Sequence, residues 1–210
     1  PQSGTVRLGT VFLTHLPSHR IAQGGISRTF QATRLFNSLS VLDNLRVAQR
    51  GHRLGNVLGA LAGLGRKSGK PAPGQSSFRP DQKALLELLA FVGYHGDVHQ
   101  QAANLPFVDR RLVELARALA PRPQVLLLDE PAAGLSQNDK QALAQIIRRI
   151  ASAGIRVILI EHDMDLVMGI SDRVVVLDSG AVICDDVPAV VQRSPAVLAA
   201  YLGTESPDLS

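Results

Sequence analysis

The sequence predicts an α/β protein built on a parallel sheet that is covered by helices. Two short, mostly apolar runs, residues 125–128 (VLLL) and 156–160 (RVILI), have the length and composition of strands buried on both faces. The segment between them is amphipathic, and it can begin with Ser136 as its cap and end at Gly154. A strand, helix, strand unit of this kind has parallel strands joined by a right-handed crossover.

The first 31 residues predict short elements. Residues 5–8 and 10–13 are β-prone and are separated by a glycine, which indicates a small β element. Ser18 is expected to cap a short helix over residues 19–23, and residues 26–31 (ISRTFQ) read as a brief extended segment.

Three helices are predicted between the small β element and the first apolar run. They cover residues 40–50 with Ser40 as the cap, residues 81–92, and residues 108–120. Their expected buried positions are Val41, Leu42, Leu45 and Val47; Leu85, Leu86, Leu88 and Leu89; and Leu112, Leu115, Ala116 and Leu119.

Residues 51–80 shift in composition to Gly, Ser, Pro, Lys and Arg and predict a poorly packed insertion, helical at most over 56–64. Residues 67–71 (KSGKP) resemble part of a phosphate loop. The motif G-x-x-x-x-G-K-S/T fails here, because Leu64 replaces its first glycine and Pro71 its hydroxyl residue. We therefore reject this segment as a phosphate site.

The end of the chain predicts a hairpin followed by a helical tail. Residues 174–177 and 181–184 form the two strands, and Asp178-Ser179-Gly180 joins them. The tail runs from residue 188 to about residue 202.

Composition narrows the function classes. The 210 residues are 45% hydrophobic and 19% charged, as is ordinary for a globular protein, and no apolar stretch is long enough to span a bilayer, so membrane contact is expected through a partner. The net charge is +4, but basic residues are not interleaved with aromatic ones, which argues against nucleic-acid binding. The single cysteine, Cys184, excludes an internal disulfide.

Acidic residues follow both predicted strands of the parallel unit. Asp129 and Glu130 follow the first, and Glu161 and His162 follow the second. The carboxyl ends of parallel strands open onto one crevice, where a carboxylate needs a cation or strong donors. A metal or an activated water is the expected partner, although a lone acid or histidine at such a place is as often a plain loop residue.

These motifs together resemble the nucleotide-binding subunit of ATP-binding cassette (ABC) transporters. Residues 126–130 look like the Walker B strand, residues 134–136 like the D-loop, His162 like the switch histidine and Gln31 like the Q-loop glutamine. The closer likeness is to importers of branched-chain amino acids, through LPSHRIA, RTFQATRLF, LDEPAAGL, IEHDMDLVMGISDRVVVLDSG and AAYLG. The fold implied is an ABC-type parallel sheet with a helical subdomain and a small antiparallel β element.

The resemblance implies a role in phosphoryl transfer for each site residue, with ATP and Mg²⁺ as cofactors. Asp129 would hold Mg²⁺, Gln31 would contact the metal or the water, and Glu130 would be the general base. His162 would contact the γ-phosphate. Ser136 would contribute to the nucleotide site, and residues near Gln31 would face a membrane permease.

Two departures from the family pattern lead to further expectations. The family's first strand and phosphate loop precede a region resembling residues 1–8, so the chain reads as the interior of a longer protein. Without the phosphate loop, we expect these 210 residues alone neither to bind ATP tightly nor to hydrolyse it. The loss of the first strand would also leave a gap in the sheet.

The second departure concerns the signature sequence, LSGGQ in the family, which contacts the nucleotide on a partner subunit. Here it reads Leu105-Pro106-Phe107-Val108-Asp109. Pro106 has no hydroxyl, Val108 lacks the freedom of glycine, and Asp109 places negative charge at a helix start. A weakened contact is one interpretation; Asp109 as an ordinary first-turn residue is the other.

We expect three regions: residues 1–38, a helical subdomain over 39–120, and an α/β core over 121–210. The leading functional hypothesis is an ATPase subunit at the cytoplasmic face of the plasma membrane, paired with a second nucleotide-binding subunit. The alternative is a non-catalytic subunit that docks on a permease or dimerises. An ABC protein of DNA repair is disfavoured, because no long coiled coil separates the two halves.

Overall fold

The structure is a computed structural model that describes residues 3–31, 33–49 and 82–202. The chain divides into two compact units, Pro1–Ile160 and Glu161–Ser210, and each is described by itself. The predicted insertion at residues 51–80, with its phosphate-loop-like segment, lies outside the described residues. Among the helices of the described ranges, none has both the length and the apolar character that crossing a membrane requires.

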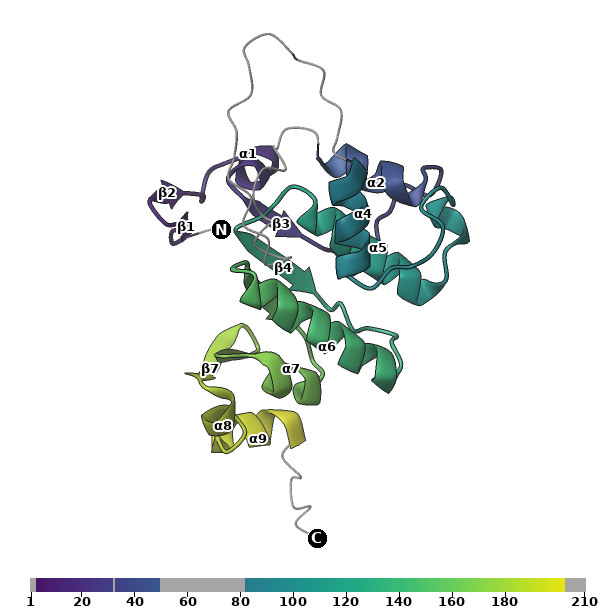
Figure 1. Cartoon of the computed structure of the whole chain (residues 1–210). Coiled ribbons are helices and arrows are strands. Elements are labelled where there is room, and N and C mark those ends of the chain that lie inside the picture. Colours follow the sequence, from purple (N-terminus) through teal and green to yellow (C-terminus); the bar gives the residue numbers. More distant parts are fainter. Residues whose placement is uncertain (1–2, 32, 50–81, 203–210) are drawn as a thin grey trace. The chain divides into compact units, whose positions relative to one another are not determined.

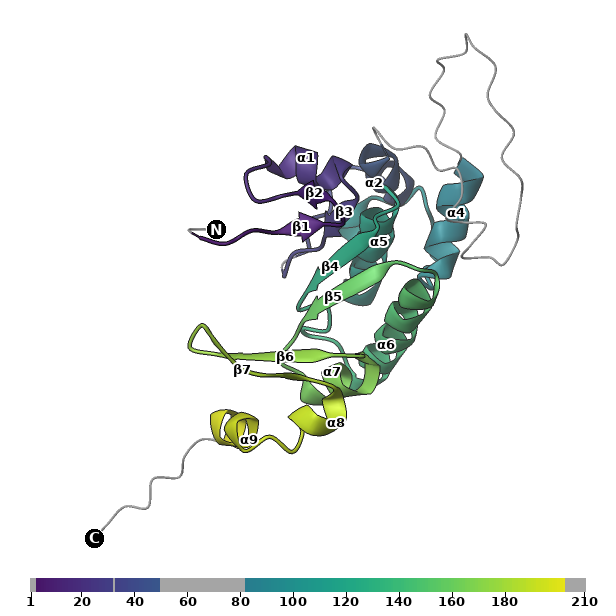
Figure 2. The same cartoon turned by 90° about the vertical axis from the view of Figure 1, so that its left-hand side faces the viewer.

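A three-stranded parallel sheet forms the centre of the first unit (Figure 2). Its strands are β3 (Ile26–Arg28), β4 (Val125–Asp129) and β5 (Arg156–Ile160), with β4 in the middle. Val125 of β4 pairs with Ile26 on one side and with Arg156 on the other. The predicted parallel arrangement of the two apolar runs is confirmed.

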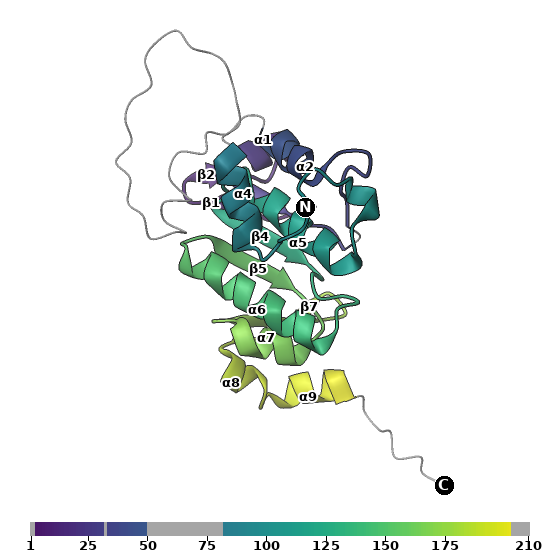
Figure 3. The same ribbon diagram turned by 45° about the vertical axis from the view of Figure 1, so that its right-hand side comes forward.

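Helix α6 (Gln137–Ser152) connects β4 to β5 and lies along β5 (Figure 3). Ser136 caps it, since the Ser136 hydroxyl accepts a hydrogen bond from the Asp139 backbone N–H. Gly154 follows its end with φ of 89°, a conformation that glycine adopts without strain. The four buried residues of α6 are those expected from helical spacing: Leu143, Ile146, Ile147 and Ile150.

The prediction that β5 is buried on both faces was wrong. Ile158 is 54% exposed and Ile160 is 55% exposed, whereas Val157 and Leu159 between them are half-buried. Successive side chains of a strand point to opposite faces, and α6 covers only one face of β5. An apolar run alone does not reveal which of its two faces is covered.

Helices α2 (Val41–Ala48), α4 (Gln82–Phe91) and α5 (Phe107–Leu119) pack against one another (Figure 1). Val47 and Leu86 are exposed and Leu112 is only half-buried, so their predicted core positions were wrong. The inward faces of α2 and α5 instead include two polar residues, Asn44 and Glu114. Hydrophobicity alone gave the wrong face at these positions, because burial follows helix orientation.

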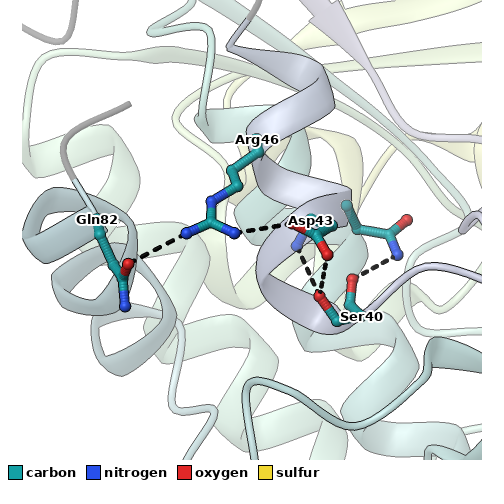
Figure 4. A network of polar contacts seen from close by, with 5 residues as sticks. Ser40, Asp43, Arg46 and Gln82 are labelled. Atoms are coloured by element: carbon teal, nitrogen blue, oxygen red, sulfur yellow. Dashed lines mark hydrogen bonds and ion pairs between the residues drawn. The ribbon is translucent and has the colours of Figure 1, made fainter. Parts of the chain in front are cut away.

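A polar network links α2 to α4 (Figure 4). The Ser40 hydroxyl caps α2 by accepting from the Asp43 backbone N–H at 3.0 Å, as predicted, and donates to the Asp43 carboxylate at 2.7 Å. Arg46 donates to Asp43 at 2.9 Å and to the side-chain oxygen of Gln82 at 3.1 Å. The Ser40 hydroxyl and the Arg46 guanidinium hold the pKa of Asp43 below its usual value.

The amino-terminal part contains β1 (Arg7–Leu8) and β2 (Val11–Phe12), which pair antiparallel as expected. Helix α1 (Ser18–Gln23) follows. Its cap is Pro17, with no side-chain hydrogen bond, so the prediction of Ser18 as the cap was wrong. A short 3₁₀ helix, η1 (Ala102–Asn104), precedes α5 and was not predicted.

The second unit contains α7 (Met164–Ile170), the hairpin of β6 (Val174–Asp178) and β7 (Ala181–Asp186), and two short helices. Ser179 and Gly180 both have positive φ, the conformation of a tight two-residue hairpin turn. The predicted continuous tail is two helices, α8 (Pro188–Val191) and α9 (Pro195–Leu202), because a proline cannot continue a helix. The core of this unit consists of Val174, Val176, Val191 and Val197.

Candidate functional site

Asp129 and Glu130 lie at the carboxyl end of β4. Asp129 is the last residue of the strand, and the backbone N–H of Glu130 donates to the Ile160 carbonyl of β5 at 2.9 Å. Glu130 has φ of 45°, a left-handed conformation that a side chain rarely adopts. Such conformations are concentrated at functional sites, where the surrounding structure holds them.

The neighbouring strand brings Gln31 to Glu130. Beyond β3, the Thr29 backbone N–H donates to the Leu127 carbonyl at 2.9 Å, so the chain continues alongside β4. The Thr29 hydroxyl in turn accepts from the Asp129 backbone N–H at 3.3 Å. Two residues later, Nε2 of Gln31 donates to Oε2 of Glu130 at 2.7 Å. The structure therefore brings three of the sequence-predicted residues to one edge of the sheet.

Arg28 holds the carboxylate of Asp129. Its Nη2 lies 2.8 Å from Oδ2 of Asp129, while the guanidinium itself is about half exposed to solvent. Arg28 was not predicted from the sequence, although a basic residue three positions before Gln31 was visible in the RTFQ segment. The predicted metal-binding role of Asp129 stays a prediction.

Residues 105–109 begin helix α5. Leu105 is buried, and Pro106 caps the helix without any side-chain hydrogen bond. Phe107 is half exposed, and its ring lies against Gly134, so that a Cβ added at Gly134 would be 3.2 Å from the ring. Val108 and Asp109 occupy the first turn and are partly exposed. The predicted signature and D-loop regions are thus in contact within one chain.

Two further predicted residues are Ser136 and His162. The hydroxyl of Ser136 is engaged at the start of α6, where it contacts the backbone N–H and the carboxylate of Asp139. His162 belongs to the second unit, where its ring is largely exposed and its Nδ1 lies 4.0 Å from Oε2 of Glu161. Its convergence with Asp129 and Glu130 stays a prediction.

Two residues of α5 that sequence reasoning missed lie beside this edge. Nη2 of Arg111 donates to the Gln31 carbonyl at 3.0 Å, and Nη1 of Arg111 lies 3.6 Å from Oε2 of Glu114. Burial raises the pKa of Glu114, an effect that the nearby backbone N–H of Arg34 and the positive charge of Arg111 oppose. Glu114 lies between two apolar residues, Val113 and Leu115, but that position alone does not identify a buried acid.

Comparison with known proteins identifies the family. Residues 1–133 match the family model described as ABC transporter, and residues 181–206 match the one described as branched-chain amino acid ATP-binding cassette transporter. The chain is 38% identical to the high-affinity branched-chain amino acid transport ATP-binding protein BraF of Pseudomonas aeruginosa, covering 97% of this chain and 77% of BraF. The chain belongs to the ABC transporter family.

Other ABC proteins support the same assignment. The chain is 37% identical to the high-affinity branched-chain amino acid transport ATP-binding protein LivG of Escherichia coli, again over 97% of this chain and 77% of the relative. A crystal structure of a nucleotide-free ATP-binding cassette from an ABC transporter superposes with a TM-score of 0.71 at 22% identity, covering 96% of this chain and 78% of that chain. The crystal structure of the ADP conformation of MJ1267, an ATP-binding cassette of an ABC transporter, gives a TM-score of 0.69 at 23% identity, covering 92% of this chain and 74% of that chain. These likenesses confirm the expected fold class.

The donors at this edge of the ABC cassette fit a magnesium-nucleotide complex. Asp129 offers a carboxylate and Gln31 an amide, and oxygen donors of this kind suit Mg²⁺. In the described ranges no group of three or more His, Cys, Asp or Glu side chains could hold a metal ion. Magnesium sites commonly use one or two protein ligands together with substrate phosphates.

Proposed function

We propose that this chain belongs to an ATP-binding and ATP-hydrolysing subunit of an importer for branched-chain amino acids. The main support for this proposal is the hydrogen bond from Gln31 to Glu130, next to Asp129 at the carboxyl end of β4. In this proposal Glu130 is the general base, Gln31 is the amide that positions it, and Asp129 is the metal-binding carboxylate at the same edge of the sheet. Membership of the ABC transporter family supports this proposal.

Each side chain has a distinct task in this proposal. Glu130 accepts the proton of the attacking water as general base, and Gln31 holds its carboxylate through the 2.7 Å hydrogen bond. Asp129 and the amide oxygen of Gln31 would hold Mg²⁺. When bound, ATP would supply the phosphoryl group and Mg²⁺ would neutralise part of the charge that develops on it. Positioning and charge provide most of the rate in such reactions.

His162 and Ser136 extend the proposed site. His162 would donate to the γ-phosphate from the loop that follows β5, and its exposed ring is compatible with a ligand contact. Ser136, at the start of α6, would contribute near the nucleotide. Residues 105–109 would face the nucleotide of a second cassette, so that two subunits complete the sites.

The solute is carried over from the names of the relatives, and the partners and the location from the family resemblance. BraF and LivG are described as branched-chain amino acid transport ATP-binding proteins, and residues 181–206 match a family model of the same description. We propose permease subunits as partners, with the segment around Gln31 to Leu42 at their contact. The chain would then act peripherally at the cytoplasmic face of the membrane.

The proposal is tested by replacing the general base. We expect Glu130→Gln in the complete gene product to reduce ATP turnover at least about a hundredfold, because general bases contribute about 10²–10⁴-fold, while ATP binding persists. Glu87→Gln is the matched control, since Glu87 is an exposed acid on α4 paired at 4.0 Å with Lys83. Undiminished turnover in Glu130→Gln would contradict the proposed mechanism.

Residues 105–109 favour an alternative, a non-catalytic subunit that docks on a permease or pairs with an intact cassette. Pro106, Val108 and Asp109 stand where the family resemblance implies hydroxyl and glycine residues. Changing them together to Ser, Gly and Gln should raise turnover if the partner contact is only weakened. ATP turnover by the complete gene product separates the alternatives, because only a catalytic subunit hydrolyses ATP.

Uptake into proteoliposomes that contain the permease subunits identifies the solute. We expect ATP-dependent accumulation of leucine, isoleucine or valine, and none with the Glu130→Gln variant. Uptake of urea or an amide instead would move the proposal to a different solute class.

A further inference from the structure

Glu114 is an acid buried inside helix α5. Its side chain is 4% exposed, and the adjacent Val113 and Leu115 are both buried. Removing a carboxylate from water is unfavourable unless strong donors surround it. The Arg34 backbone N–H donates to Oε1 at 3.2 Å, and the guanidinium of Arg111 lies 3.6 Å from Oε2. The buried carboxylate therefore holds the Arg34 backbone and the Arg111 side chain in place.

Arg111 lies one turn before Glu114 on α5. It contacts the chain before residue 32, whereas Glu114 contacts it after residue 32. Its Nη2 donates to the Gln31 carbonyl at 3.0 Å, and its guanidinium is 5.4 Å from the centre of the Phe107 ring. The side chain of Arg111 is only 10% exposed. Arg111 therefore binds the chain at the Gln31 carbonyl, before residue 32, and Glu114 binds it at the Arg34 N–H, after residue 32.

The segment that Arg111 and Glu114 contact lacks the regular backbone pairing of a helix or a strand in its described residues. Among its described residues, Gln31 and Thr33 to Phe36 belong to no helix or strand. The last described backbone bond to β4 is at Thr29, whose N–H reaches the Leu127 carbonyl. Side chains hold this segment instead: those of Arg111 and Glu114 near Gln31, and that of Asn44 of α2 at Phe36.

The surroundings strengthen these polar contacts. A small pocket beside Arg111 and Glu114 is lined otherwise by Thr29, Leu115, Leu128, Pro131 and Leu143, most of them apolar. Hydrogen bonds and ion pairs are stronger in such a low-dielectric environment than in water. Loss of Arg111 removes the cation that faces Glu114, and loss of Glu114 removes the acceptor of the Arg34 N–H.

We propose that Arg111 and Glu114 are positioning residues that fix the Gln31 loop and thereby keep the Gln31 amide on Glu130. Helix α5 begins at the 105–109 segment, so the same helix joins that segment to the candidate base. This inference rests on the proposed function for its effect on turnover, but its effect on the loop does not depend on ATP hydrolysis.

Hydrogen exchange of the complete gene product tests the loop directly. In Arg111→Met, we expect amides of residues 30–34 to exchange about tenfold faster, because a hydrogen bond from a charged group is lost, while β4 and α6 are unchanged. The matched control is Arg110→Met, which removes the neighbouring arginine and its 3.1 Å bond to Asn37. Equal exchange of residues 30–34 in the two variants would overturn the proposal.

Steady-state kinetics test the consequence for Glu130. We expect Arg111→Met to lower kcat about tenfold and to leave the KM for ATP within about twofold, because misplacement by about 1 Å affects chemistry more than binding. Arg111→Lys should restore part of the rate, since lysine keeps the charge but not the planar fork. A rise in KM with unchanged kcat would overturn the positioning role.

Glu114→Gln keeps an acceptor for the Arg34 N–H and removes the charge that faces Arg111. It preserves volume, so it also serves if Arg111→Met fails to fold. We expect faster exchange at residues 30–34, and unchanged exchange there would contradict the role of Glu114. If the unmodified protein shows no ATP turnover, the proposed function fails, while the exchange measurements still decide whether α5 positions the loop.

Discussion

The side-chain nitrogen of Gln31 lies 2.7 Å from a carboxylate oxygen of Glu130, although 99 residues separate the two in sequence. This contact joins the end of β3 to the end of β4. It places a neutral donor on the candidate general base, which keeps the base oriented without adding charge. The chemistry of the proposed site can be tested through this pair.

Replacing Gln31 with Glu should shift the pH dependence of turnover. Two carboxylates at hydrogen-bond distance disfavour double ionisation. The second of the two pKa values of the pair is therefore raised. A base must be deprotonated to act, and the acidic limb of the pH–rate profile should therefore move to higher pH. The measurement is kcat against pH, with Gln31→Met as the uncharged control. An acidic limb in the same place for both variants would contradict the contact.

Replacing Arg28 with Met should ease metal binding at Asp129. The 2.8 Å ion pair occupies the carboxylate that the metal would use. Such partly exposed pairs contribute up to about 1 kcal/mol, so the Mg²⁺ concentration for half-maximal turnover should fall by up to about fivefold. Arg28→Lys, which retains the charge, should leave the Mg²⁺ concentration for half-maximal turnover nearly unchanged. A higher magnesium requirement in Arg28→Met would instead indicate that Arg28 supports the nucleotide.

Replacing Gly134 with Ala should destabilise the protein by about 1–2 kcal/mol, because a side chain at positive φ is strained. Gly134 has φ of 77°, and the added Cβ would also meet the Phe107 ring at 3.2 Å. Gly154→Ala is the control for backbone strain alone, since Gly154 has φ of 89° and no atom within 4 Å of an added Cβ. Urea unfolding should give the larger loss for Gly134→Ala, and combining it with Phe107→Leu should reduce the difference. Equal losses would exclude the ring contact.

Replacing Asp43 with Asn should reduce stability at neutral pH but not in acid. The Ser40 hydroxyl and the Arg46 guanidinium lower the pKa of Asp43 from 3.8, so the folded state favours its ionised form. The stabilisation is present above the unfolded pKa and is lost as pH falls through the folded pKa, below about 4. Urea midpoints of both proteins across this range should converge on acidification.

Ser40→Ala provides a second measurement of the same network. It removes the largest cause of the Asp43 shift, so the pKa of Asp43 should rise toward its usual value in an NMR titration. It also removes the cap of α2, which typically costs about 1 kcal/mol. An unshifted Asp43 resonance would place the cause elsewhere.

The amino-acid sequence by itself determined the features that depend on neighbouring residues. The strand, helix, strand unit from β4 to β5, the Ser40 and Ser136 caps and the Ser179-Gly180 turn all follow from local periodicity and hydrogen bonding. The motif residues Gln31, Asp129 and Glu130 were also visible, because their order along the chain is that of the family.

Only the tertiary structure decided which side chains meet and which faces are covered. The contacts of Arg28 with Asp129 and of Glu114 with the Arg34 backbone span 101 and 80 residues, and no local pattern encodes such pairs. The exposure of Ile158 and Ile160 likewise depends on what packs against β5, not on their hydrophobicity. Local preferences act over a few residues, whereas burial and charge pairing are set when distant segments come together.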